Sequence, residues 1–235
     1  MNLLHTYKNG NYTVSIYSDG TKIRETDEDK FISSFPENID IKISDRCNIG
    51  CAYCHENSTR NGEVADFDYE FLYSLKRGTE LAIGGGNVFE NPKLDAFLKF
   101  CKNKGIIANI TVNQEHFKDE YYIIFDWIER KEVYGVGISY NGNSEELDEA
   151  FKGCEEFKNN CVIHVINGVH SYDEIMKLRN KGYKLLILGY KDLRRGTSYK
   201  KEHEDQIKNN QQEIYNNIHK ILTAFDVVSF DNLAI

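Results

Sequence analysis

The chain has 235 residues, with 29 Lys or Arg against 37 Asp or Glu, so its net charge at pH 7 is −8. Hydrophobic residues make up 40% of it and only 2 residues are proline, which excludes a disordered chain and leaves enough length for one domain or two small ones. The acidic balance argues against broad binding to nucleic acids or anionic membranes. There is no run of about 18 apolar residues and no export signal at the start, so we expect a cytoplasmic protein without a membrane span.

Residues 1–35 are expected to form an N-terminal β-hairpin that is an appendage to the rest of the chain. Residues 12–17 alternate between apolar and polar side chains, residues 18–20 have the composition of a turn, and residues 21–24 return. Residues 36–235 are expected to form one core domain. Its strand candidates begin near residues 39, 80, 107, 134, 161 and 184.

Helical patterns separate these strand candidates. Asn91 and Pro92 predict the start of the second helix, and Gly105 predicts its end. Ser171 and Glu174 predict a capping box at the start of the fifth helix.

The chain is predicted to finish with a helix over 205–225 and a short strand over 227–230. Successive strands with helices between them pair in parallel through right-handed crossovers, so the predicted class is α/β. The six βα units are compatible with an open doubly wound sheet and with a barrel of βα units.

Three of the six cysteines, Cys47, Cys51 and Cys54, fall within eight residues directly after the first strand of the core. Such clustering indicates metal binding or thiol redox chemistry. A haem attachment site at Cys51–His55 would require export, and a zinc site would add His55 to the three cysteines. A thioredoxin-like couple would leave Cys47 without a role, whereas a three-cysteine iron–sulfur cluster would use all three thiols and leave one iron open.

The CxxxCxxC spacing, with Tyr53 just before the third cysteine, resembles the defining motif of the radical S-adenosylmethionine (SAM) superfamily. The resemblance implies a partial (β/α)₆ barrel with an N-terminal β-hairpin and a C-terminal helix, and a [4Fe–4S] cluster on Cys47, Cys51 and Cys54. The open iron would bind the methionine part of SAM, and reductive cleavage would give a 5′-deoxyadenosyl radical that abstracts hydrogen from an unidentified substrate. An electron donor such as a flavodoxin or ferredoxin is implied as a partner, and a peptide or protein is among the candidate substrates.

Glycines and amide side chains follow the predicted strands, at the ends where the site of a βα barrel lies. Residues 83–87 resemble the glycine-rich element that holds the methionine ammonium in this superfamily, with Asn87 where glutamate is common. An amide oxygen can accept from an ammonium without the charge-assisted part of the bond. The residues that the resemblance assigns to SAM are Tyr53, Gly84, Gly85, Gly86, Asn87, Asn113, Ser139 and Asn167.

Two other functions stay open at this point. One is a non-catalytic iron–sulfur electron-transfer or zinc-binding module, and the other is an activating enzyme for a partner glycyl radical protein. The basic stretch 191–196 is interpreted either as a solvated loop or as a site for a carboxylate or phosphate. Cys101 lies on the apolar face of its helix and is expected to pack in the core. No residue is assigned a catalytic role.

Overall fold

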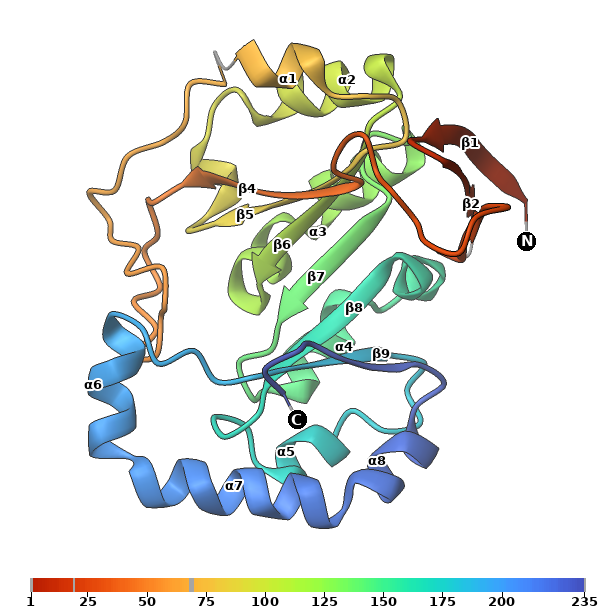
Figure 1. Ribbon diagram of the computed structural model, residues 1–235. Coiled ribbons are helices and arrows are strands. Elements are labelled where there is room, and N and C mark those ends of the chain that lie inside the picture. Colours follow the sequence, from red (N-terminus) through yellow and green to blue (C-terminus); the bar gives the residue numbers. More distant parts are fainter. Residues whose placement is uncertain (1, 19, 68–69, 235) are drawn as a thin grey trace.

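Seven parallel strands form the main sheet of the computed structural model, which describes residues 2–18, 20–67 and 70–234 (Figure 1). The strands are β4 (Asn38–Ser44), β5 (Glu80–Gly85), β6 (Ile107–Asn113), β7 (Gly135–Ser139), β8 (Cys161–Ile166), β9 (Lys184–Leu188) and β10 (Val228–Phe230). Their spatial order follows the sequence from β4 to β10, whereas in a doubly wound sheet the order reverses at the middle. The α/β class and the partial barrel are therefore confirmed, and so is the short strand predicted near 227–230.

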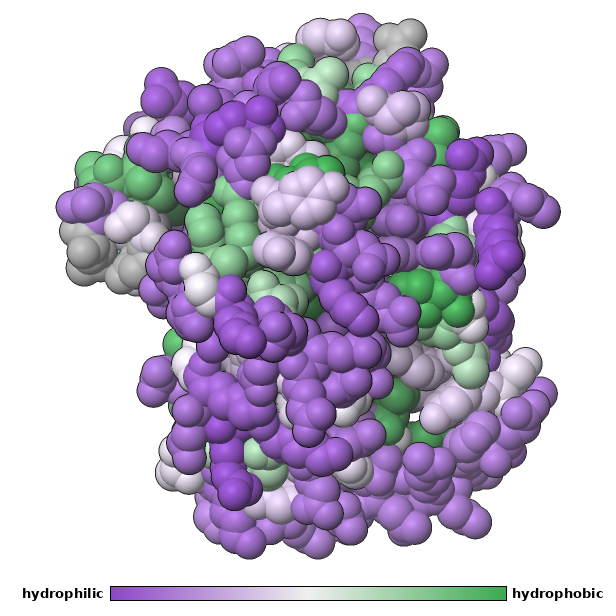
Figure 2. All heavy atoms as spheres, turned by 180° about the vertical axis from the view of Figure 1, so that it is seen from behind, coloured by the Kyte–Doolittle hydropathy of each residue, from purple (hydrophilic) through white to green (hydrophobic). Residues whose placement is uncertain are grey.

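Most of the helices cover the outer side of the curved sheet, whereas α6 lies at the carboxyl ends of the strands (Figure 1). The helices are α1 (Glu70–Ser74), α2 (Leu94–Lys104), α3 (Gln114–Glu129), α4 (Ser144–Ala150), α5 (Tyr172–Met176), α6 (Arg195–Glu202), α7 (Glu204–Asn216) and α8 (Ile218–Ala224), with 3₁₀ turns η1 (Val88–Glu90) and η2 (Glu155–Asn160). None of the helices in the described part of the chain is long and apolar enough to cross a membrane. On the face seen in Figure 2, hydrophilic side chains cover most of the surface.

The strands of the main sheet have two different faces. On β8, Cys161, Ile163 and Val165 are buried and belong to the hydrophobic core shared with the helices. The alternate residues of the same strand, including His164, are only half buried and therefore face the concave side. The same alternation on β7 and β9 gives a packed outer face and a more open inner face, which is the arrangement that leaves room for a ligand inside a partial barrel.

A separate three-stranded antiparallel sheet precedes the barrel, formed by β1 (Leu3–Asn9), β2 (Tyr12–Tyr17) and β3 (Lys22–Glu25). The predicted hairpin corresponds to β2 and β3, whereas β1 was not predicted from the sequence. Val14 and Ile16 pack on Ile107 at the start of β6. The sheet is thus held at the amino-terminal ends of the barrel strands, opposite the ends that carry the cysteines.

Two predicted segments differ from the structure. The helix predicted over 205–225 is broken at Asn217, whose side-chain Nδ2 donates to the carbonyl oxygen of Glu213 at 2.9 Å. Asparagine side chains compete in this way with the backbone hydrogen bonds of a helix. The stretch after β9, interpreted as a loop, contains the helix α6.

The second helix begins at Leu94, two residues after the predicted position of Pro92. Oδ1 of Asn91 accepts from the N–H of Lys93 at 3.0 Å, in the turn that leads into the helix. Its Nδ2 donates to the carbonyl oxygens of Ile43 and Ala65, both at 2.9 Å, so this buried side chain also joins β4 to the end of the segment that carries the cysteines. The capping box of Ser171 and Glu174 is present as predicted.

Candidate functional site

The cysteines lie in residues 45–66, here called the cysteine loop, which connects the end of β4 to the region before α1. The loop folds back on itself because the backbone N–H of Cys47 donates to the carbonyl of Thr59 at 2.9 Å, and the N–H of Thr59 donates to the carbonyl of Asp45 at 3.0 Å. A further link runs to α3, where Nε2 of the buried His116 lies 3.0 Å from Oδ1 of Asn48. These bonds fix the backbone around the first two cysteines.

The three thiols of the loop are free and partly buried. Burial raises the pKa of the Cys51 thiol, and the nearby Cys54 and Cys47 sulfurs raise it further, because adjacent thiolates repel each other. Nδ2 of Asn113, at the end of β6, is 3.9 Å from Sγ of Cys51. A bound metal ion offsets the repulsion between neighbouring thiolates, so these thiols are a reasonable donor set for iron.

Within residues 2–18, 20–67 and 70–234, no three histidine, cysteine, aspartate or glutamate side chains converge to hold a single metal ion. The thiolates of an iron–sulfur cube bind different irons, so they need not converge on one point. The imidazole of His55, the fourth ligand of the zinc alternative, lies beside other groups: Nε2 is 3.3 Å from Oε1 of Glu56 and 3.4 Å from Nζ of Lys191.

The glycine run at the end of β5 packs directly on the start of the cysteine loop. The N–H of Gly86 donates to the carbonyl of Ser44 at 2.6 Å, and the N–H of Asn87 donates to the carbonyl of Arg46 at 2.7 Å. A Cβ on Gly86 would lie 2.4 Å from the Arg46 oxygen, and one on Gly85, where φ is +122°, would lie 2.4 Å from the Ser44 oxygen. The absence of side chains here is what allows the two segments to approach so closely.

Gly84 and Asn87 lie on either side of Gly85 and Gly86, and their surroundings are different. A Cβ on Gly84 would meet only Cβ of Thr111, at 3.8 Å, so this position has free space on the concave face. Oδ1 of Asn87, the oxygen expected to accept from an ammonium, already accepts from the N–H of Phe89 at 3.1 Å and caps the 3₁₀ turn η1. The side chain therefore has a structural role as well, which the sequence pattern does not indicate.

Three polar residues lie at one level on the concave face of neighbouring strands. Asn113 on β6 pairs in register with Ser139 on β7, which pairs with His164 on β8. A Cβ on Gly137 would lie 2.3 Å from Cε1 of His164, so the glycine makes room for the imidazole. Burial lowers the pKa of His164 to about 4, and the imidazole is neutral at pH 7. The structure thus brings the predicted Asn113 and Ser139 together and adds His164 to them.

Tyr53 lies beside the thiols and beside the segment that follows β9. Its ring meets that of Tyr199 edge-on at 5.7 Å, and Tyr199 stacks on His203 at 4.1 Å. Burial raises the pKa of Tyr53 well above its usual range, and negative charge at Cys51 adds to the effect. The aromatic groups therefore form a wall on one side of the cysteine loop that excludes water.

The basic stretch after β9 is bound to the cysteine loop. Nη1 of Arg194 donates to the carbonyls of His55 and Glu56 at 3.1 and 3.0 Å, and Nη2 of Arg195 donates to the carbonyl of Ser58 at 2.5 Å. Figure 1 shows α6 beside this loop, at the carboxyl ends of the strands. Both guanidinium groups therefore bind the backbone of the cysteine loop, while the side chain of Arg194 is still 56% exposed to solvent.

Asn167, after β8, contacts the end of the chain. Its Nδ2 donates to the carbonyl of Ala234 at 2.9 Å, while its buried Oδ1 has no hydrogen-bond partner among the described residues. Nearby, the N–H of Gly189 donates to Oδ1 of Asp231 at 2.9 Å. The C-terminal segment thus covers the carboxyl ends of β8 and β9, next to a free acceptor oxygen.

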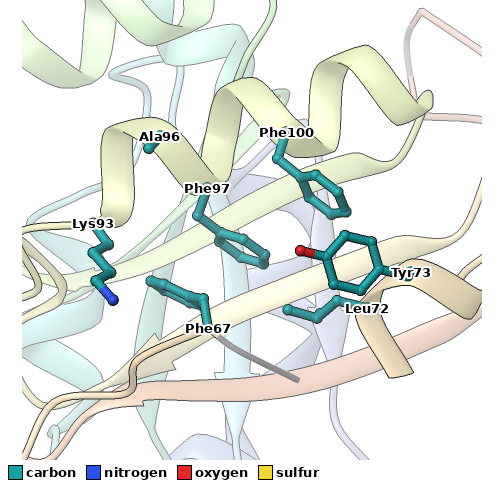
Figure 3. A pocket seen from close by; sticks show the side chains of 7 residues that line it. All are labelled: Phe67, Leu72, Tyr73, Lys93, Ala96, Phe97 and Phe100. Atoms are coloured by element: carbon teal, nitrogen blue, oxygen red, sulfur yellow. The ribbon is translucent and has the colours of Figure 1, made fainter. Parts of the chain in front are cut away.

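The other cysteines lie elsewhere. Cys101 and Cys161 are buried in the core, as expected for Cys101, and Cys154 precedes η2. An apolar pocket of about 190 Å³ lies between α1 and α2 and contains none of the predicted site residues (Figure 3). Phe67 and Phe97 stack at 4.2 Å along it, so it is part of the packing of the outer helices.

Several residues of the site were not found from the sequence. Asn91, Arg194, Arg195 and His164 act through contacts between segments far apart in the chain. The basic stretch gave a signal in its composition, but its partners, the backbone carbonyls of the cysteine loop, leave no trace in a sequence.

Comparison with known proteins shows the fold. No family model and no curated protein matches this sequence. Among solved structures, Streptococcus suis SuiB bound to the precursor peptide SuiA matches with a TM-score of 0.57 and 17% identity, over 86% of this chain and 50% of SuiB. SuiB bound to S-adenosylmethionine matches with a TM-score of 0.55 and 16% identity, over 85% of this chain and 51% of SuiB. The chain therefore has the same fold as a part of SuiB that makes up about half of its length.

Proposed function

We propose that this protein is a radical SAM enzyme. The observation that carries the proposal is the place of the three-cysteine loop, which follows the first strand of a partial barrel whose fold is shared with SuiB, a protein crystallised with S-adenosylmethionine. Residues 36–235 would be the core domain of the enzyme, with the N-terminal sheet appended to it. All six cysteines are free thiols, which suits a protein of the reducing cytoplasm.

Cys47, Cys51 and Cys54 would hold a [4Fe–4S] cluster with one iron open. The partly buried thiols, the amide of Asn113 beside Cys51 and the aromatic wall at Tyr53 fit such a group. When bound, the cluster and SAM together supply a 5′-deoxyadenosyl radical through reductive cleavage of a carbon–sulfur bond. The chain itself positions the ligands and keeps water out.

The concave face beside the loop supplies the contacts for SAM. The carbonyls of Gly84, Gly85 and Gly86 would accept from the methionine ammonium, and Asn87 would contribute less than an acidic residue because its oxygen already caps η1. Ser139 and Asn113 would bind the polar part of the molecule, and Tyr53 would lie against the adenine. Oδ1 of Asn167, which has no hydrogen-bond partner in the part of the chain that the structure describes, would accept from the adenine amino group.

A peptide or protein is the substrate class we propose. The support is that SuiB, whose fold this chain shares, was crystallised with a precursor peptide. The inner face also carries neutral hydrogen-bonding groups, Thr111, Ser139 and His164, that suit the amide groups of a peptide. A flavodoxin or ferredoxin would deliver the electron.

The experiment is anaerobic reconstitution with iron and sulfide, followed by electron paramagnetic resonance of the dithionite-reduced protein with and without SAM. We expect a [4Fe–4S] signal that SAM alters, with 5′-deoxyadenosine as a product. Cys47→Ala should lose both, and Cys154→Ala, outside the loop, should keep both. A cluster that SAM leaves unchanged would indicate electron transfer alone, and bound zinc without a cluster would overturn the proposal.

A further inference from the structure

We propose that Asn113 is a positioning residue for the iron–sulfur site: its amide N–H is directed at the sulfur of Cys51, where it holds this ligand in place and raises the reduction potential of the cluster. This inference rests on the proposed function and gives Asn113 a role besides any contact with SAM. It is carried by the contacts at both ends of the Asn113 amide and by those of the helix that begins beside it.

The amide of Asn113 is held at one end and faces Cys51 with the other. Oδ1 accepts from the backbone N–H of Glu115 at 2.9 Å and caps α3. Because that N–H needs an acceptor, the bond determines which end of the amide is the oxygen. Nδ2 is then the atom that lies 3.9 Å from Sγ of Cys51. The group directed at this sulfur is therefore a hydrogen-bond donor and not an acceptor.

The elements that carry Asn113 hold it rigidly beside the cysteine loop. It is the last residue of β6, and α3 begins at the next residue without a loop between them. In the first turn of α3, Nε2 of the buried His116 lies 3.0 Å from Oδ1 of Asn48, a residue between Cys47 and Cys51 in the chain. Residues three apart share one face of a helix, so this turn contacts the cysteine loop at two points. The two contacts together keep the donor and the sulfur in place.

Capping alone does not explain an amide at position 113. Asparagine, aspartate and serine cap helices about equally well, and the positive end of the helix dipole favours aspartate. Aspartate would direct a carboxylate oxygen at Cys51 in place of Nδ2, and two negative groups would then repel each other. Of the three residue types, only asparagine combines a capping oxygen with a donor for the sulfur.

The effect on the reduction potential follows from the charge of the site. Three thiolates make the cluster site negative, and reduction adds one more negative charge. A hydrogen bond to a thiolate sulfur is stronger when the sulfur carries more negative charge, so the donor stabilises the reduced state more than the oxidised state. Asn113 therefore favours acceptance of the electron that the proposed reaction needs.

The test uses the reconstituted full chain without SAM and compares Asn113→Ser and Asn113→Asp, which both keep a capping oxygen. The matched controls are Asn143→Ser and Asn143→Asp, because the exposed Asn143 caps α4 in the same way through the N–H groups of Glu145 and Glu146. Midpoint potentials are measured by dye-mediated titration followed by electron paramagnetic resonance. We expect N113S to lower the equilibrium constant for reduction about tenfold, a shift of about 59 mV for one electron. N113D should lower it further, and both Asn143 variants should stay close to wild type.

Two further measurements separate positioning from capping. In protein labelled with ¹⁵N at the side-chain amide of asparagine, pulsed electron paramagnetic resonance of the reduced cluster detects a nitrogen that is hydrogen-bonded to a ligand sulfur. This coupling should be present in the wild type and in N143S and absent in N113S. Thermal unfolding of the apoproteins should have the same midpoint in N113S and wild type, because serine keeps the cap.

Equal potentials and equal nitrogen coupling in N113S and N143S would overturn the proposal. Loss of the cluster together with earlier unfolding in the Asn113 variants would also overturn it, because the residue would then act through its cap alone. Loss of the cluster in both Asn113 variants at unchanged unfolding, with both Asn143 variants keeping it, would support the positioning role. Failure of the wild type to form a cluster would instead refute the proposed function, and this inference with it.

Discussion

The backbone N–H of Gly86 donates to the carbonyl oxygen of Ser44 at 2.6 Å and joins the end of β5 to the beginning of the cysteine loop. Together with the bond from Asn87 to Arg46, it determines where the backbone stands just before Cys47. The glycine run therefore has a structural task in addition to any contact with a ligand. Its three members are expected to respond differently to the addition of one methyl group.

Gly86→Ala should destabilise the protein by about 1–3 kcal/mol, because the new Cβ would lie 2.4 Å from the Arg46 oxygen and would push the cysteine loop away. Gly84→Ala is the matched control, since its Cβ meets only ordinary contact with Thr111 at 3.8 Å. Urea unfolding and iron content after reconstitution measure the two effects. Equal stability and equal iron content in the two variants would contradict the packing role of Gly86.

Asn87→Ala should lower the free energy of unfolding by about 0.5–2 kcal/mol, because it removes the oxygen that accepts from the N–H of Phe89 and caps η1. Asn87→Asp keeps a capping oxygen and should retain the stability of the wild type. Under the proposed function it should also bind SAM more tightly, because a carboxylate strengthens the bond to the methionine ammonium. Thermal unfolding gives the first result and SAM titration of the reconstituted protein gives the second. A destabilised Asp variant would show that the cap depends on the amide.

The neutral His164 makes stability depend on pH. Its pKa is about 4 in the folded chain and 6.5 when exposed, so the unfolded state binds more protons between these values. The neutral imidazole contributes to the free energy of unfolding above pH 6.5, and this contribution is lost as the pH falls towards 4. It amounts to about 1.4 kcal/mol for each unit by which the pKa differs between the folded and unfolded chains. Between pH 7 and pH 4.5, the free energy of unfolding of His164→Gln should therefore fall by about 1–3 kcal/mol less than that of the wild type. Urea unfolding at the two pH values measures this difference.

The control for this titration is His219→Gln, which removes an exposed histidine on α8. Its stability should follow that of the wild type over the same pH range, because the side chain is exposed and its replacement leaves the core unchanged. The acidic groups common to all three proteins cancel in the comparison. Parallel curves for the His164 variant and the wild type would show that the imidazole is not held neutral.

Glu37 joins the N-terminal sheet to the barrel. Burial by itself would raise the pKa of its carboxyl group, but hydrogen bonds from Arg24 at 2.7 Å and from the Tyr12 hydroxyl at 2.6 Å lower it below its usual value. Glu37→Gln should lower the free energy of unfolding by about 1–3 kcal/mol at pH 7, because hydrogen bonds to a carboxylate are stronger than those to a neutral amide. Glu25→Gln, on the exposed strand β3, is the control and should change little in denaturant unfolding.

The carboxylate of Glu37 also gives this effect a pH dependence of known sign. A carboxyl group whose pKa is lowered in the folded chain stabilises it above the pKa of the unfolded chain, and the stabilisation is lost as the pH falls. The difference between wild type and Glu37→Gln should therefore shrink in acid. A constant difference down to pH 3 would show that the bonds do not depend on ionisation.

Much of the fold could be predicted from the sequence because it depends on local patterns. The alternation on β2, the capping box at Ser171 and the apolar face around Cys101 reflect periodicities of 2 and 3.6 residues. The first strand and the break at Asn217 were missed. The exposed β1 carries little apolar alternation, and a single side-chain bond to Glu213 decides where the last helix is interrupted.

The sequence by itself determined the order of the βα units and the cluster of three cysteines after the first of them, because strand and helix periodicity and the spacing of cysteines are properties of neighbouring residues. Only the tertiary structure decided that Arg194 and Arg195 hold the cysteine loop, that Gly86 supports it and that His164 joins Asn113 and Ser139 on the inner face. These contacts join residues more than 20 positions apart, and their partners are often backbone atoms, which every residue has and no sequence pattern marks.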